Sequence, residues 1–191
     1  MNKILNLKEQ IEKYIPYNEQ EKSDKEIMLK SLEIFDDMLT RENKICHFTA
    51  SNWIVNKERT KVLMIYHNIY KSWSWTGGHA DGDNDLLYVA QKETREETSL
   101  QNFKVINPLP ISVEILPVKS HTRKGKYIPA HQHFNITYLF EADENEMIRI
   151  KEDENSGVKW INLDEVEKYS SEEKMKPITT KKIGQRLIIY K

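Results

Sequence analysis

Three glutamates, Glu93, Glu96 and Glu97, have a spacing that can build a metal site. Residues at i, i+3 and i+4 of a helix share one face, with Cβ atoms about 5 to 6 Å apart. At about 6 Å, each pair of like charges costs about 3 kcal/mol in partly enclosed surroundings, so an enclosed face needs a positive partner. Mg²⁺ or Mn²⁺ fits best, because these ions prefer carboxylate and carbonyl oxygens. A solvated, acidic helix end is the alternative interpretation.

The sequence around these acids predicts the helix and the turn that would position them. Apolar residues repeat at helical spacing from Leu86, and the same stripe continues through the glutamates to Leu100, so we expect a helix over residues 86–98. Gly77 and Gly78 permit a close approach of the backbone just before this helix. A main-chain carbonyl there could face the same cation as the glutamates.

The first 45 residues are expected to form a helical extension, and residues 46–191 the main domain. Helical spacing over residues 3–15 predicts a first helix. A capping box at Ser23 and Glu26 predicts a second helix that ends near Thr40.

The main domain is expected to combine strands with helices. Segments rich in β-branched and aromatic residues predict a hairpin from residues 47–55 and 61–67, and later strands at 134–142 and 158–163. Residues 103–118 are interrupted by Pro108 and Pro110, so we expect a strand, a bend and a second strand there. The remainder is expected to be helical at first, with breaks at Pro177 and Gly184. This order indicates an α/β fold in which helices pack against a mixed sheet.

Composition excludes several classes of partner. The 191 residues include 29 basic and 30 acidic side chains, so the net charge of −1 gives no bulk attraction to nucleic acid or to an anionic membrane. No run of about 18 apolar residues could span a bilayer. Charged residues such as Lys8 interrupt the apolar stretch that a signal peptide needs, and Cys46 is a single cysteine. We expect a cytoplasmic protein that binds small molecules, and neither nucleic acid nor membranes.

Residues 78–100, GHADGDNDLLYVAQKETREETSL, resemble the Nudix box, whose pattern is G-x5-E-x7-R-E-U-x-E-E-x-G-U, with U a bulky aliphatic residue. Gly78 takes the first position, and Glu93, Glu96 and Glu97 match the glutamates after the arginine position. Four positions depart from the pattern: Asn84 replaces the first glutamate, Lys92 the arginine, Thr94 an aliphatic residue and Ser99 the last glycine. The likeness extends over residues 45–170 and implies a Nudix-like α/β/α sandwich around a mixed sheet.

The resemblance also implies an activity. Nudix hydrolases typically cleave a pyrophosphate linkage in a nucleoside diphosphate derivative by metal-assisted attack of water. By position, Glu96, Glu97 and the Gly77 carbonyl would hold Mg²⁺ or Mn²⁺, and Glu93 would be a further ligand or the base that orients water. Lys92 would steady a glutamate without the bidentate fork of an arginine. The expected catalytic residues are therefore Glu93, Glu97 and Lys92. Ser99 predicts a looser helix end.

Two further features surround this predicted site. Some relatives add an acid from a later strand or loop, and Glu141 and Glu154 are candidates here. The interval between Glu114 and Glu141 holds no acid, and its positive residues could bind substrate phosphates, although a solvated loop is the alternative. The residues that we expect to bind substrate are Arg123, Lys124, His131 and His133.

The histidines have simpler interpretations at this stage. His131 and His133 point to the same side of a strand and could form half of a zinc site. We do not expect zinc, because the sequence shows no third soft ligand nearby. We interpret His47 as a core histidine with satisfied hydrogen bonds.

Two other functions compete with hydrolysis. A degenerate Nudix domain could bind a nucleotide or a protein without catalysis, which the departures at Asn84, Lys92 and Ser99 favour. The isopentenyl diphosphate isomerase branch of the same fold uses a cysteine and a glutamate, but Cys46 lies far from the box in the sequence. The N-terminal helices could pack on the domain, form a homodimer contact or cover the pocket. Nothing in the sequence selects one nucleotide derivative as the substrate.

Overall fold

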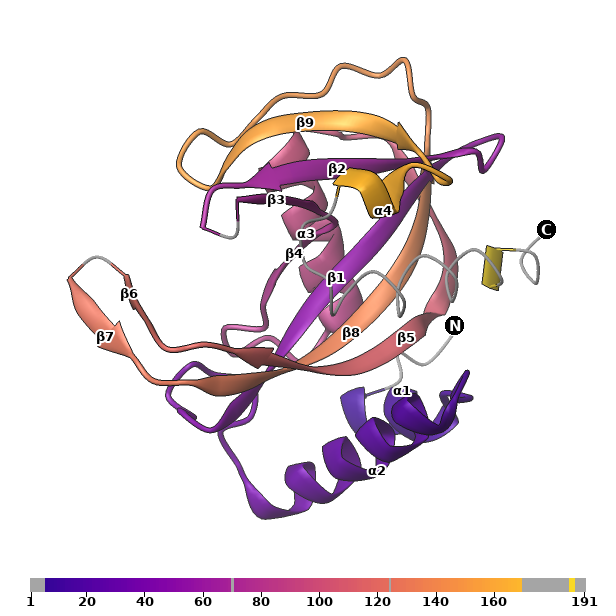
Figure 1. The fold of residues 1–191 in the computed structure, drawn as a ribbon. Coiled ribbons are helices and arrows are strands. Elements are labelled where there is room, and N and C mark those ends of the chain that lie inside the picture. Colours follow the sequence, from indigo (N-terminus) through magenta and orange to yellow (C-terminus); the bar gives the residue numbers. More distant parts are fainter. Residues whose placement is uncertain (1–5, 70, 124, 170–185, 188–191) are drawn as a thin grey trace.

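The computed structural model describes residues 6–69, 71–123, 125–169 and 186–187, with a strongly curved sheet at its centre (Figure 1). The expected helix with breaks at Pro177 and Gly184 lies almost entirely outside the described residues. No helix in the described ranges is long and apolar enough to cross a membrane.

The main sheet has seven strands in the order β3-β2-β1-β8-β5, with β4 paired to β1 and β9 paired to β2. Its strands are β1 (Cys46–Asn56), β2 (Lys61–His67), β3 (Ser72–Ser74), β4 (Thr76–His79), β5 (Phe103–Val118), β8 (His131–Ala142) and β9 (Asn155–Asn162). Strands β1 and β8 are parallel and the other pairs are antiparallel. The predicted mixed α/β fold and the hairpin of β1 and β2 are therefore confirmed.

Alternation along the strands places an apolar core on each face of the sheet. Phe48 and Ala50 of β1 contribute to the core that includes the buried side of α3 (Leu86–Thr98). Trp53 and Val55 contribute to the opposite core, together with Val166 of the short helix α4 (Val166–Tyr169). Helices therefore pack on both faces.

The helices α1 (Leu7–Lys13) and α2 (Glu19–Ile34) pack against β5 (Figure 1). Their Leu7, Ile11 and Met28 belong to the same buried core as α3. The Asp24 carboxylate accepts a hydrogen bond from the Ile115 N–H at 3.0 Å, which satisfies a donor on the outer edge of β5. Of the three arrangements considered for these helices, packing on the domain is the one observed.

The predicted start and the predicted end of the second helix are both wrong. Helix α2 begins after Asn18, whose side chain accepts from the Glu21 N–H at 2.9 Å, so Ser23 lies inside the helix; the helix ends at Ile34, before Thr40. An asparagine cap earlier in the chain therefore replaced the predicted capping box.

The bend expected at Pro108 and Pro110 is absorbed within one strand, β5. The register of β5 against β8 shifts twice, between Val105 and Asn107 and between Asn107 and Ser112. Because β5 is an edge strand with bulges here, the prolines do not end it.

The two-stranded ribbon of β6 (His121–Arg123) and β7 (Lys126–Ile128) extends beyond the main sheet (Figure 1). Arg123 therefore ends β6, and Lys124 lies outside the described residues. The prediction that both bind substrate stays a prediction.

Candidate metal centre and active site

Helix α3 spans the predicted residues and is fixed to the sheet through its backbone. Asn52 of β1 donates a hydrogen bond from Nδ2 to the Ala90 carbonyl at 3.0 Å, and Thr76 of β4 donates to Asn52 Oδ1 at 2.7 Å. Because Asn52 is fully buried, these bonds fix the position of α3 relative to β4. Glu93 and Glu97 of α3 therefore face the Gly77–Gly78 turn.

Glu97 is the most enclosed of the three glutamates, with 3% of its surface exposed. Its Oε2 accepts the Gly77 N–H at 2.9 Å. Burial, together with the charges of Glu93 and Glu154, raises the pKa of Glu97 to about 8, although the Gly77 N–H acts in the opposite direction. Burial is the largest cause of this rise.

Glu93 lies directly over Gly78. A Cβ built at Gly78 would overlap the carboxylate of Glu93, so this position requires glycine as long as Glu93 keeps its place. Burial, and next the charge of Glu96, raise the pKa of Glu93. The turn and the helix thus approach each other as closely as the sequence predicted.

Two lysines flank the outer carboxylate, Glu96. Lys92 Nζ lies 3.7 Å from Glu96 Oε1, and Lys151 Nζ lies 3.7 Å from Glu96 Oε2. Lys151 also pairs with Glu154 at 3.0 Å. The ammonium of Lys151 therefore compensates part of the negative charge on the exposed side of the cluster.

Of the two further acids considered, Glu154 lies with the cluster, where its charge raises the pKa of Glu93 and of Glu97. Glu141 is near the far end of β8, where it pairs with Arg59 at 3.6 Å. The loop that carries Lys151 and Glu154 is held against α3, because Asn155 donates from Nδ2 to the Glu97 carbonyl at 3.0 Å.

This donor set fits a hard divalent cation. Glu93 and Glu97 lie against the Gly77–Gly78 turn, and burial and neighbouring negative charges raise the pKa of both, whereas Glu96 lies further out beside Lys92 and Lys151. A cation with a preference for oxygen would relieve both effects. The departures from the Nudix pattern are also accommodated: Thr94 is fully buried and its hydroxyl donates to the Ala90 carbonyl at 2.9 Å.

A buried polar strip on the face opposite α3 was not predicted. Thr49 and Ser51 of β1 lie beside Asn135 and Thr137 of β8, and Asn135 bonds to three of these side chains at 3.0 Å. All four residues are buried. The signal in the sequence was the alternation of polar with apolar residues in both strands. Because successive side chains of a strand point to opposite faces, this alternation collects the polar residues on one face.

The histidine interpretation is wrong in one respect. His133 does have further imidazoles nearby, because His47 is its register partner on β1 and His79 ends the neighbouring strand β4. One ring nitrogen from each of these three histidines lies within 4.8 Å of the other two. His47 is buried, but the hydrogen-bonding capacity of its ring is only partly satisfied, because its Nε2 has no hydrogen-bond partner among the described residues.

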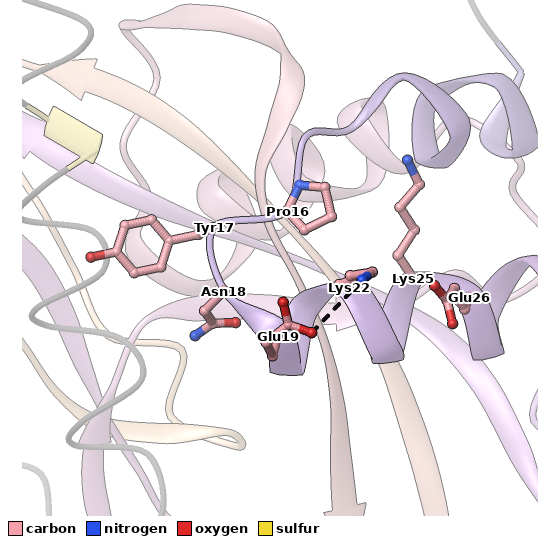
Figure 2. Close-up of a pocket in the computed structure, with 7 residues that line it drawn as sticks. All are labelled: Pro16, Tyr17, Asn18, Glu19, Lys22, Lys25 and Glu26. Carbon is pink, nitrogen blue, oxygen red and sulfur yellow. Dashed lines mark ion pairs between the residues drawn. The ribbon is translucent and has the colours of Figure 1, made fainter.

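A hollow of about 470 Å³ lies elsewhere, beside α2 (Figure 2). Two of its charged residues, Glu19 and Lys22, pair at 3.8 Å, and its Lys25 donates to the carbonyls of Glu12 and Tyr14. The charged groups of Glu19, Lys22 and Lys25 are thus already engaged with each other or with the backbone, and none of the expected catalytic residues lines this hollow.

Comparison with known proteins agrees with the fold. The family profile described as NUDIX domain matches residues 47–182. The chain therefore belongs to the Nudix hydrolase family, in which divalent-metal-dependent cleavage of pyrophosphate linkages is the general activity.

Among individual proteins, an RNA pyrophosphohydrolase of Pelagibacter ubique (strain HTCC1062) is 30% identical over 117 residues, which cover 59% of this chain and 74% of the relative. Two crystal structures of a C. elegans Ap4A hydrolase share the fold. They have TM-scores of 0.53 and 0.52 and are 17% and 19% identical, covering 74% and 73% of this chain and 97% of theirs.

Proposed function

We propose that this protein hydrolyses a pyrophosphate linkage in a nucleoside diphosphate derivative, with Mg²⁺ or Mn²⁺ held by Glu93, Glu96, Glu97 and the Gly77 carbonyl. The observation that carries the proposal is the position of Glu97, which is buried against the Gly77 N–H and has a pKa raised to about 8. A buried carboxylate destabilises a fold unless a partner compensates it, and a bound cation is the partner that the rest of this cluster fits.

Each residue of the cluster has a proposed role. The cation, when bound, supplies the positive charge that the attacking water and the departing phosphate both need. The Gly77 N–H fixes the orientation of Glu97, and Lys92 holds Glu96 from the outer side. Glu93, the acid closest to Gly78, orients the attacking water and accepts its proton.

The relatives narrow the first substrates to test. One is named an RNA pyrophosphohydrolase and the other an Ap4A hydrolase, so RNA and Ap4A are the first substrates to test. We propose that His131 and His133, with Arg123 and Lys124, meet the anionic part of such a substrate. Replacing Arg123 and Lys124 together by alanine should raise KM more than it lowers kcat. An unchanged KM would favour the alternative interpretation, in which this segment is a solvated loop.

The test is a panel of nucleoside triphosphates, Ap4A, 5′-triphosphorylated RNA, nucleotide sugars and ADP-ribose, assayed for phosphate or nucleotide release with and without Mg²⁺ or Mn²⁺. We expect release to require the cation and to fall at least about a hundredfold in Glu97→Gln. Glu141→Gln is the matched control, because Glu141 lies at the far end of β8. Silence across the panel, with cation binding intact, would favour the degenerate binding module.

The isomerase alternative gains no support from the structure. Cys46 is buried, and its Sγ contacts Met38 Sδ at 3.6 Å. Burial also raises the pKa of the Cys46 thiol, which disfavours the reactive thiolate.

A further inference from the structure

Four histidines converge where β1 and β8 begin and β4 ends. The ring centroid of His47 lies 5.2 Å from that of His79, 4.9 Å from that of His131 and 5.0 Å from that of His133. His133 in turn lies 4.9 Å from His79 and 5.0 Å from His131. Such a group of imidazoles is not explained by the glutamate cluster, whose donors are oxygens.

Two of these rings are already oriented as metal ligands. His47 Nδ1 lies 3.0 Å from the Asn43 carbonyl, and His131 Nδ1 lies 2.9 Å from the Pro129 carbonyl. Because a carbonyl can only accept, each Nδ1 carries the proton and each Nε2 of a neutral ring carries a lone pair. This second hydrogen bond to a backbone carbonyl is the arrangement that usually fixes a metal-binding histidine.

The free lone pair of His47 is the strongest single sign of a missing ligand. Its Nε2 is buried and has no hydrogen-bond partner among the described residues. A buried polar atom without a hydrogen-bond partner destabilises the fold, and a ligand at this atom would remove that penalty.

The spacing is close to that of a tetrahedral site. With metal–nitrogen bonds of about 2.1 Å, the nitrogens of a tetrahedral site lie about 3.4 Å apart. The Nε2 atoms of His131 and His133 are hydrogen-bonded at 3.1 Å, so His133 Nε2 carries the proton that a bound metal would displace, and one ring nitrogen from each of His47, His79 and His133 lies within 4.8 Å of the other two. Rotations of the side chains, without a change of backbone, could bring the three rings onto one ion.

We propose that His47, His79 and His133 bind one Zn²⁺ ion, with His131 in position to be the fourth ligand. Imidazole nitrogens select Zn²⁺ and similar transition metals over Mg²⁺, so this site and the glutamate cluster would hold different ions. Arg41 lies nearby, but Asp81 balances its charge through a hydrogen bond of 2.7 Å from Arg41 Nε to Asp81 Oδ1.

The bound zinc would tie together three strands that are not consecutive in the chain. His79 directly follows Gly78, so the ion would also fix the end of the turn that faces Glu93. His131 and His133 are also proposed to meet the substrate, but zinc binding does not require hydrolysis and can be tested with the metal alone.

The experiment is a calorimetric titration of the full chain, stripped with chelator, with ZnCl₂ alone. We expect one equivalent to bind with a dissociation constant below about 1 μM. At free zinc about a hundredfold above that constant, the melting temperature should rise by about 5 to 10 °C. His47→Ala should weaken binding at least about a hundredfold, and His79→Gln serves as a second variant should His47→Ala fail to fold. His121→Ala, in β6, is the matched control and should bind zinc like the unaltered protein.

X-ray absorption spectra of the zinc-loaded protein separate this site from the carboxylates. Imidazole nitrogens at about 2.0 to 2.1 Å, with the scattering pattern of histidine rings, would support the proposal. An oxygen-dominated shell would overturn it, and so would binding that both His47→Ala and His79→Gln leave unchanged, or a dissociation constant above about 10 μM.

Discussion

Gly77 and Gly78 are adjacent, but they should respond to alanine in opposite ways. A Cβ at Gly77 would lie 2.7 Å from both the Ala50 carbonyl oxygen and Ser51 Cβ, so the new atom would collide with strand β1. A Cβ at Gly78 would instead collide with the carboxylate of Glu93, which is the movable end of a side chain. The first substitution therefore perturbs the sheet and the second perturbs the proposed metal site.

The magnitudes follow from these contacts. Overpacking against backbone costs about 1 to 3 kcal/mol, so Gly77→Ala should lower the melting temperature by about 4 to 8 °C. In Gly78→Ala, Glu93 must move by about 1 Å or more to reach normal contact distance, and a displacement of about 1 Å at a reacting centre can cost about a hundredfold in rate. Its melting temperature should change by less than about 3 °C.

The assay combines thermal unfolding by circular dichroism with initial rates of Mg²⁺-dependent hydrolysis on the best substrate of the panel. The unaltered protein and both alanine variants are measured at the same cation concentrations. Full activity in Gly78→Ala would refute the reasoning, because Glu93 would then have no catalytic role at its present position. A Gly78→Ala variant as unstable as Gly77→Ala would refute it as well, because the Glu93 side chain would then not be free to yield.

Three further predictions concern the same helix and its surroundings. Ser99 ends α3 in the left-handed region at φ 61°, so Ser99→Gly should raise the melting temperature by about 2 to 4 °C, and a decrease in a thermal scan would contradict this. In chelator, the folded-state pKa of Glu97, about 8, lies above its unfolded value, so the folded protein binds more protons and stability should fall as pH rises from about 5 to 8. Measured by urea unfolding, the loss of stability between these pH values should be about 3 kcal/mol smaller in Glu97→Gln than in the unaltered protein. Equal pH profiles for the two proteins would contradict the assignment. Lys151→Gln removes a cation that pairs with Glu96, so Mg²⁺ should bind severalfold more tightly by calorimetry, and weaker binding would show that Lys151 supports the site.

The site elements that are local in sequence could be predicted. The stripe that begins at Leu86 predicted the bounds of α3 correctly, and the helical spacing brings Glu93 and Glu97 to the glycine turn, whereas Glu96 lies further out beside two lysines. The Gly77–Gly78 turn met this helix as expected. Helical periodicity and glycine turns depend on residues that are only a few positions apart in the chain. A single sequence was therefore sufficient to predict these elements.

The histidine group and the polar strip could not be assembled in the same way. His47 meets His133 only because β1 and β8 are parallel neighbours, with partners separated by 86 positions. Hydrophobic alternation shows which face a residue occupies, but it carries no information on which strand lies beside it. The helix start at Asn18 is a different case, because the Asn18 side chain caps the Glu21 N–H and places Ser23 inside the helix, although the sequence from Ser23 to Glu26 also has the pattern of a capping box.

The central claim is that Glu93, Glu96 and Glu97 together bind the divalent cation. The most direct measurement is an Mn²⁺ titration followed by electron paramagnetic resonance, on the unaltered chain, Glu97→Gln and Glu141→Gln. The account predicts that Glu97→Gln weakens binding at least about tenfold and that Glu141→Gln matches the unaltered protein. Equal Mn²⁺ affinity in all three proteins would contradict it.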